Sequence, residues 1–295
     1  MNDILDWGIT VVLWFQQFSP ALDIPFKILT FFGNEEFFLI FFPLFYWCFD
    51  KKNGIRLTLF FLISAYVNFI GKAIFAQPRP FQYSTEVKGI VSASGGGLPS
   101  GHTQGSVVLW GFLMSKYKST WLVILGCAMI VLVPLSRIYL GVHFPTDLLA
   151  GYLIGALLLF LYFRLEPRIE QWFAGMSFMK RLAIASVLPL IFLLFSNGVK
   201  DIVSAASAML GLCLGFVAEH EWVAMDASGD LWKKILRFLI GVLMLAGIFF
   251  GLKVAFQALA PEMFFRGVRY FMLGAWGGLG APWLFVKTGL AEKHV

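Results

Sequence analysis

Long apolar stretches separated by short polar segments recur along this 295-residue chain. A helix needs about 20 apolar residues to cross the hydrocarbon core of a bilayer. Apolar residues make up 59% of the chain and charged residues 14%, which excludes a soluble enzyme, a disordered chain and a secreted disulfide scaffold. We therefore predict an all-α, polytopic membrane helical bundle with about nine spans. The predicted spans are 37–49, 54–77, 102–116, 120–141, 146–165, 182–198, 201–218, 235–257 and 270–287.

Two apolar segments before the first predicted span are too short to cross a bilayer without strain. Residues 4–18 include Asp6, Gln16 and Gln17, so this segment either lies in the interface or crosses with strain. Residues 26–33 are interpreted as interfacial. The N-terminus does not resemble a cleavable signal peptide, because it carries acidic residues where a signal peptide carries positive charge.

Basic residues lie in alternate loops, which predicts the orientation of the chain in the membrane. The net charge is 23 − 17 = +6, but no basic stripe is present that could follow nucleic-acid phosphates, so nucleic-acid binding is not expected. If the spans alternate, positive-inside bias makes one set of loops cytoplasmic. Arg266 and Arg269 are exceptions on the outer side. The cytoplasmic set is Lys51, Lys52, Arg56, Lys116, Lys118, Arg164, Arg168, Lys180, Arg181, Lys233, Lys234, Arg237, Lys287 and Lys293.

Polar residues that could take part in binding or catalysis gather at the opposite, extracytoplasmic ends of the spans. The loop 77–101 is the longest polar segment and is rich in proline and glycine, so it is a candidate wall of a site. Alternating topology places the polar residues at one depth. They are Lys72, Arg79-Pro80, Pro99-Ser100-Gly101-His102, Ser136-Arg137, His143 and Asp147.

This set of residues is suited to a phosphoryl group. Arginine offers a planar fork of donors and lysine a point charge, so Lys72, Arg79 and Arg137 form a candidate phosphate site. Ser100 and Gly101 stand at a predicted helix start, where backbone N–H groups bind anions. Each residue alone has an ordinary structural explanation, such as anchoring at the interface or helix capping. Their combination favours a functional site.

The histidines supply the reactive groups. His143 and Asp147 are four residues apart and share a helix face if the helix has begun. The carboxylate then fixes the imidazole tautomer, which leaves the other ring nitrogen as a nucleophile towards phosphorus. His102 is free to protonate the leaving oxygen and then to deprotonate water. The predicted chemistry is phosphoryl transfer through a phosphohistidine, with neither a metal nor another cofactor.

The order and spacing of these residues resemble the three-part signature of the type-2 phosphatidic acid phosphatase superfamily. That superfamily includes lipid phosphatases, prenyl diphosphate phosphatases, glucose-6-phosphatases and vanadium haloperoxidases. The resemblance covers roughly residues 30–165. It implies a six-helix core with an extracytoplasmic site, in which His143 is the nucleophile, Asp147 its partner and His102 the acid/base. It also implies phosphate binding by Lys72, Arg79, Ser100, Gly101 and Arg137.

The domain prediction separates a phosphatase core, residues 1–170, from additional transmembrane helices, residues 171–295. The layout is similar to that of the glucose-6-phosphatases in three respects. Pro43 lies inside a single span, the first segment is short, and about nine spans are predicted. Residues 182–295 match no motif, and no broken helix is evident there. A lipid-moving or transporter role for these helices is an alternative from another class.

The predicted activity is hydrolysis of lipid phosphates or prenyl diphosphates, because a site at the membrane surface can receive a headgroup while the tail stays in the bilayer. The expected partners are the phosphorylated lipid substrate and the bilayer. A lipid phosphotransferase using the same intermediate, and a phosphatase of a soluble ester such as a sugar phosphate, remain alternatives. Short loops favour a bacterial plasma (inner) membrane. No oligomeric state follows from the sequence.

Overall fold

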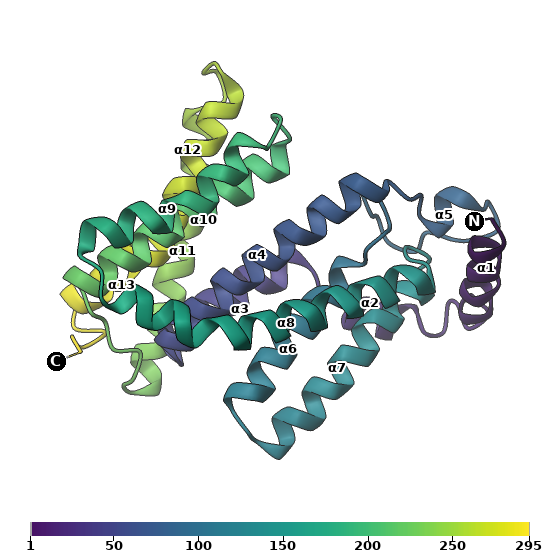
Figure 1. The fold of residues 1–295 in the computed structure, drawn as a ribbon, viewed down its shortest axis with the longest axis horizontal. Helices are drawn as coiled ribbons and strands as arrows, with labels where there is room; N and C mark the ends of the chain where they lie inside the picture. Colours follow the sequence, from purple (N-terminus) through teal and green to yellow (C-terminus); the bar gives the residue numbers. More distant parts are fainter. Residues whose placement is uncertain (1, 295) are drawn as a thin grey trace. The chain divides into compact units, whose positions relative to one another are not determined.

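The computed structural model describes residues 2–294. Within that range the chain is all α-helical and contains no β-strand, apart from one isolated bridge between Met225 and Lys293. Figure 1 shows the helices in chain order. They are α1 (Asn2–Gln16), α2 (Asp23–Phe31), α3 (Glu35–Cys48), α4 (Lys51–Phe75), α5 (Pro80–Tyr83), α6 (Gly101–Lys116), α7 (Thr120–Tyr139), α8 (Pro145–Ala174), α9 (Phe178–Leu194), α10 (Lys200–Trp222), α11 (Leu231–Ala255), α12 (Glu262–Ala275), the π-helix η1 (Trp276–Gly280) and α13 (Ala281–Lys287).

The described chain forms two compact units. One contains residues 2–38 and 63–167, and the other contains 39–62 and 168–294. The predicted all-α architecture is confirmed. Five segments, those containing α4, α7, α8, α10 and α11, are long and apolar enough to cross a membrane. A sixth is possible if α2 and α3, bent by 45° at their junction, form one span. The predicted count of nine is not confirmed, because α6 and α9 are only 16 and 17 residues long.

In the first unit, α6 and α7 form a helical hairpin (Figure 1). Glycines allow α8 to approach α6 closely. A Cβ on Gly151 would lie 2.7 Å from the carbonyl oxygen of Ser100, and one on Gly155 would lie 2.9 Å from Cβ of Val107. The beginning of α8 is therefore held against the beginning of α6, which fixes two of the predicted signature segments side by side.

The N-terminal helix α1 packs on the same unit through one apolar face. Leu5, Ile9 and Val12 are buried in a cluster with Ile138 and Phe144. Trp7 and Trp14 on the same helix are more than half exposed, as expected for a helix with one face on protein and another on lipid or interface. The predicted loop 77–101 is irregular except for the four-residue α5 and its last residue, Gly101, which begins α6.

In the second unit, α10 and α12 cross with backbone against backbone. A Cβ on Gly211 would lie 2.1 Å from the carbonyl oxygen of Phe271, and one on Gly274 equally close to that of Ala208. Small residues four apart, here Gly211 with Gly215, permit such close approach between helices in membranes. The π-helix after α12 interrupts the α-helix predicted over 270–287 without ending it. Its carbonyls serve as acceptors, since the Tyr46 hydroxyl donates to Gly278 over 3.0 Å.

Arg237 departs from its predicted place. The sequence assigned it to a cytoplasmic loop, but it lies inside α11 and is only 1% exposed. Its guanidinium donates to the carbonyl oxygens of Leu290, Trp47, Ala227 and Ser228. Four acceptors satisfy the buried charge, so this arginine links segments of the second unit instead of standing in a loop.

The α10–α12 crossing provides a test of this packing. We expect Gly211→Ala to destabilise the protein by about 1–3 kcal/mol, because the new methyl group would meet backbone that cannot move aside. The control is Gly247→Ala on α11, where the added Cβ would have no atom within 4 Å apart from the backbone and neighbouring residues of its own helix. Thermal unfolding in detergent should show a midpoint lowered by several degrees for the first variant only. An unchanged midpoint would contradict the close crossing.

Candidate active site

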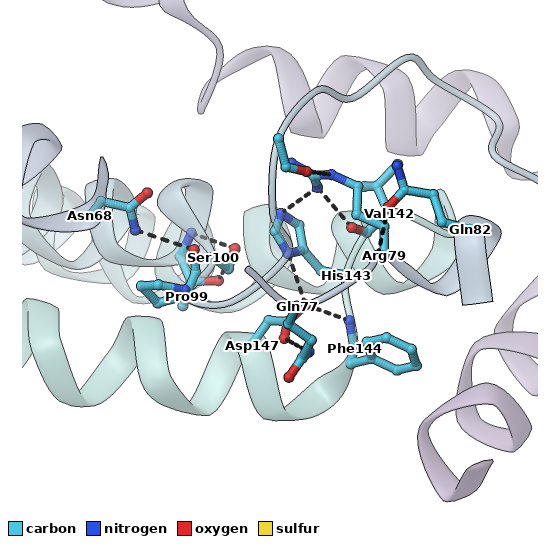
Figure 2. Close-up of polar contacts among 12 residues, drawn as sticks. Asn68, Gln77, Arg79, Gln82, Pro99, Ser100, Val142, His143, Phe144 and Asp147 are labelled. Atoms are coloured by element: carbon cyan, nitrogen blue, oxygen red, sulfur yellow. Dashed lines mark hydrogen bonds and ion pairs between the residues drawn. The ribbon is translucent and has the colours of Figure 1, made fainter. Parts of the chain in front are cut away.

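His143 lies between an acid and a cation in the link from α7 to α8. Its Nδ1 is 3.1 Å from Oδ2 of Asp147, and its Nε2 is 3.2 Å from Nη1 of Arg79. Figure 2 shows the imidazole ring between these two partners. The side chain is buried, with 1% of its surface exposed. Both ring nitrogens of His143 therefore have defined protein partners.

These partners determine the tautomer of His143. A guanidinium has only donors, so Nε2 must accept from Arg79 and carry no proton. The proton is then on Nδ1, which donates to the Asp147 carboxylate. Burial lowers the pKa of His143 well below its usual value, and the positive charges of Arg137, Arg79 and Lys72 lower it further. The ring is thus neutral at pH 7, with an unprotonated Nε2.

Asp147 stands in the first turn of α8 and is fully buried. Oδ2 also accepts from the backbone N–H of Phe144 over 2.9 Å, and Oδ1 accepts from Nε2 of Gln77 over 2.7 Å. Figure 2 shows Gln77 reaching this carboxylate. The carboxylate is held on both oxygens, so it can orient the histidine without rotating.

Arg79 is anchored by the predicted loop. It precedes α5 and is 3% exposed. Nε donates to the carbonyl oxygen of Gly95, Nη2 to that of Ser94 and Nη1 to that of Val142. The prediction that this loop forms a wall of the site agrees with these contacts. The fork of Arg79 is fixed with Nη1 directed at the candidate nucleophile.

Two further cations belong to the same unit. Arg137, in the last turn of α7, is 5% exposed and donates from Nη1 to the Thr30 hydroxyl. Its Nε is buried and has no hydrogen-bond partner among residues 2–294. Lys72, in the last turn of α4, lines a cavity of about 430 Å³ together with Gln77 and Gly95. A buried N–H without a partner is uncommon in proteins and is consistent with an anion site.

Ser100 and Gly101 begin α6, as predicted. Ser100 is the N-cap: its Oγ accepts from the backbone N–H of Thr103, and its own N–H donates to the Asp147 carbonyl oxygen over 3.0 Å. A Cβ on Gly101 would lie 3.0 Å from Oδ1 of Asn68, so the position has little room for a side chain. The first backbone N–H groups of α6 are free of intrahelical partners, as at any helix start.

His102 is the second residue of α6, and its hydrogen-bond partner comes from a different segment than the partners of His143. Its Nε2 is 2.9 Å from Oδ1 of Asn34, in the turn between α2 and α3. Its positive neighbours include Arg137, Lys72 and Arg79, the same three cations that surround His143. The two histidines therefore share one electrostatic environment.

All the residues predicted for the site lie in one compact unit. They are Lys72, Arg79, Ser100, Gly101, His102, Arg137, His143 and Asp147. Sequence reasoning missed Gln77, Asn34 and Thr30, which contact members of this set, and Asn68, which donates to the carbonyl oxygen of the adjacent Pro99. Neutral amides and hydroxyls occur widely in proteins, so nothing in their spacing distinguished them.

Two sequence models of one family match the chain. The model described as PAP2 superfamily matches residues 38–171, and the model described as PAP2 superfamily phosphatase, transmembrane extension, matches residues 203–293. The chain belongs to the PAP2 superfamily. This is the family that the signature resembled. The second match corrects the expectation that residues 182–295 match no motif.

Several curated proteins resemble parts of this PAP2 chain. An undecaprenyl-diphosphatase of Sulfolobus acidocaldarius is 36% identical over 135 residues, which are 41% of this chain and 61% of the relative. Sphingosine-1-phosphate phosphatase 1 of Mus musculus is 30% identical over 48% of this chain and 34% of its own length. Glucose-6-phosphatase 3 of Bos taurus is 27% identical over 77% and 71% respectively. The chain thus spans about a third to three fifths of the first two relatives.

Gln77 offers a test of the carboxylate support in this PAP2 site. We expect Gln77→Leu to lower the rate of phosphate release, the activity proposed below, by roughly 10-fold or more, as is typical when a residue that orients a functional group is lost. The change leaves Oδ1 of Asp147 without its partner, so the carboxylate can rotate away from His143. The matched control is Gln17→Leu, at an exposed position of the same unit. Equal turnover in both variants would show that Gln77 does not support catalysis.

Proposed function

We propose that this protein is an integral membrane, metal-independent phosphohydrolase that acts on lipid phosphates or prenyl diphosphates through a phosphohistidine. The observation that carries the proposal is the buried His143 ring, with Nδ1 on Asp147 and Nε2 on Arg79. A neutral imidazole whose free lone pair faces a guanidinium is a nucleophile placed where a phosphate anion would be bound. The family and the names of its relatives support the same activity.

The first half-reaction transfers the phosphoryl group to the enzyme. The phosphate enters between Arg79, Arg137 and Lys72, with the Ser100 hydroxyl and the N–H of Gly101 as further donors. Arg79 Nη1 then passes from His143 to a phosphate oxygen. The Nε2 lone pair of His143 forms the P–N bond as the ester P–O bond breaks, and His102 gives its proton to the leaving oxygen. Asp147 stabilises the positive charge that develops on the His143 ring.

The second half-reaction restores the enzyme. Water attacks phosphorus, His102 takes a proton from that water, and the P–N bond breaks to release inorganic phosphate. The cations and backbone donors are already in place and do not reorganise as charge develops on the phosphoryl oxygens. Such preorganisation is usually a large part of catalysis, and here it requires no metal.

The substrate class follows from the setting of the site. The site residues Lys72, Arg137 and Asp147 lie in the end turns of the long apolar helices α4, α7 and α8, so a headgroup can enter while its tail remains in lipid. Two of the relatives carry lipid substrates in their names. The glucose-6-phosphatase relative supports the alternative of a soluble sugar phosphate. A lipid phosphotransferase would use the same intermediate and replace water by a lipid acceptor.

One experiment tests the reaction and separates these alternatives. Purified protein is given phosphatidic acid, a prenyl diphosphate, sphingosine 1-phosphate and glucose 6-phosphate, each beside His143→Ala. We expect phosphate release from a lipid substrate, trapping of acid-labile phosphohistidine, and loss of both in the variant by at least 10³-fold. Release from glucose 6-phosphate alone would favour the soluble ester. Phosphorylated lipid without free phosphate would favour the transferase. Activity that survives His143→Ala would refute the mechanism.

We further propose that the site faces the extracytoplasmic side of a bacterial plasma membrane, with the chemistry in residues 1–170 and additional helices in 171–295. The alternation of basic loops supports this orientation. Glu86, in the loop after α5, and Lys118, in the turn between α6 and α7, are both exposed and lie in the same unit.

These two positions provide a matched test of orientation. In a background without native cysteines, we expect Glu86→Cys to react with a membrane-impermeant maleimide in intact cells. Lys118→Cys should react only after the membrane is opened, because positive-inside bias places its loop in the cytoplasm. The reverse pattern would place the site on the cytoplasmic side.

A further inference from the structure

A second wall of the site comes from the turn between α2 and α3, which lies outside both segments that match the family models. Asn34 in this turn places Oδ1 2.9 Å from Nε2 of His102. Gly33 lies against the same ring, since a Cβ there would be 2.5 Å from Cδ2 of His102. Thr30, one turn earlier, accepts from Nη1 of Arg137. Three residues of one short segment thus contact His102 and Arg137.

The Asn34 contact determines which nitrogen of His102 exchanges a proton. An amide oxygen only accepts, so Nε2 carries hydrogen and donates to Asn34. Nδ1 is then the nitrogen that binds or releases a proton. When Nδ1 is protonated, the Nε2–H bond to Asn34 persists, so the ring keeps its orientation in both states. The bond orients the ring without adding a charge.

The two histidines therefore have different kinds of support. His143 donates to a carboxylate, which stabilises the positive ring of a phosphohistidine. His102 donates to a neutral amide. A carboxylate at this position would hold the proton on the ring more strongly, whereas an acid/base must release the proton in one step and take it back in the next. The neutral partner fits a group that changes its protonation state twice in each turnover.

We propose that Asn34 is a positioning residue that fixes His102 for proton transfer at Nδ1 to the leaving oxygen and from the attacking water. The inference rests on the proposed function, which makes His102 the acid/base. In the first step the Nδ1 proton passes to the ester oxygen as the P–O bond breaks. In the second, Nδ1 takes a proton from water as the P–O bond to water forms and the P–N bond breaks. Asn34 keeps its hydrogen bond throughout and exchanges no proton.

The test uses two substrates that differ in their need for a general acid. An alkyl phosphate must have its leaving oxygen protonated, whereas nitrophenolate leaves from p-nitrophenyl phosphate without a proton. The rate of phosphohistidine formation is measured by rapid quench for wild type and Asn34→Leu. We expect the variant to be slower by roughly 10² on dodecyl phosphate, at the lower end of general acid–base contributions. On p-nitrophenyl phosphate the loss should be less than about threefold, with KM for both substrates little changed.

Two further variants complete the test. Asn34→Asp keeps an oxygen acceptor, so phosphohistidine formation from dodecyl phosphate should recover to within about 10-fold of wild type. Glu36→Gln, at an exposed position two residues away, should match wild type on both substrates. If Asn34→Leu does not fold, the smaller change Asn34→Ala carries the same expectation.

The results separate this inference from the proposed function. Equal losses on the two substrates would assign Asn34 a purely structural role and overturn the inference, as would a variant with wild-type rates on both. Wild-type protein that forms no phosphohistidine from either substrate would instead overturn the proposed function. A large loss confined to the alkyl substrate supports both the role of Asn34 and the proposed function.

Discussion

The candidate site depends on one buried carboxylate. Asp147 accepts from the His143 ring, from the N–H of Phe144 and from the side chain of Gln77, while its backbone carbonyl accepts from the N–H of Ser100. One residue thus connects the end of α4, the start of α6 and the start of α8. A buried carboxylate is tolerated only when its oxygens are paired, so the same contacts that stabilise it also fix the His143 ring, the candidate nucleophile.

The cations of the site differ from this carboxylate, because not all of their hydrogen-bonding groups have protein partners. Each guanidinium nitrogen of Arg79 has a partner in a loop carbonyl or in His143, whereas Arg137 keeps a buried Nε–H without a protein partner among the described residues. Three positive groups in one low-dielectric region repel one another, and an anion between them relieves that repulsion. In the proposed function, phosphate binding and the stability of the site are therefore linked: phosphate or vanadate that binds the native site would stabilise the fold by RT ln(1 + L/Kd), where L is the free ligand concentration.

The set of candidate site residues could be predicted from the sequence because charged residues and histidines are rare in apolar spans. Lys72, Arg79, His102, Arg137, His143 and Asp147 could be assigned to one face from alternating topology alone. Gln77 and Asn34 could not, because an amide is ordinary in a loop and its role depends on which side chain it meets in three dimensions. Arg237 was misread for a related reason. Its four carbonyl partners come from distant segments, so its burial has no local signal.

The 45° bend between α2 and α3 has a consequence for the supply of water. Where a helix breaks, the first N–H groups of the next helix have no intrahelical acceptor, and lipid cannot satisfy them. The break therefore belongs at a hydrated level of the membrane, and the two acidic residues that follow it, Glu35 and Glu36, are suited to that level. Asn34 stands at this break, beside His102. In the proposed mechanism, the turn that contacts His102 would thus also be the place where the hydrolytic water enters an otherwise apolar protein.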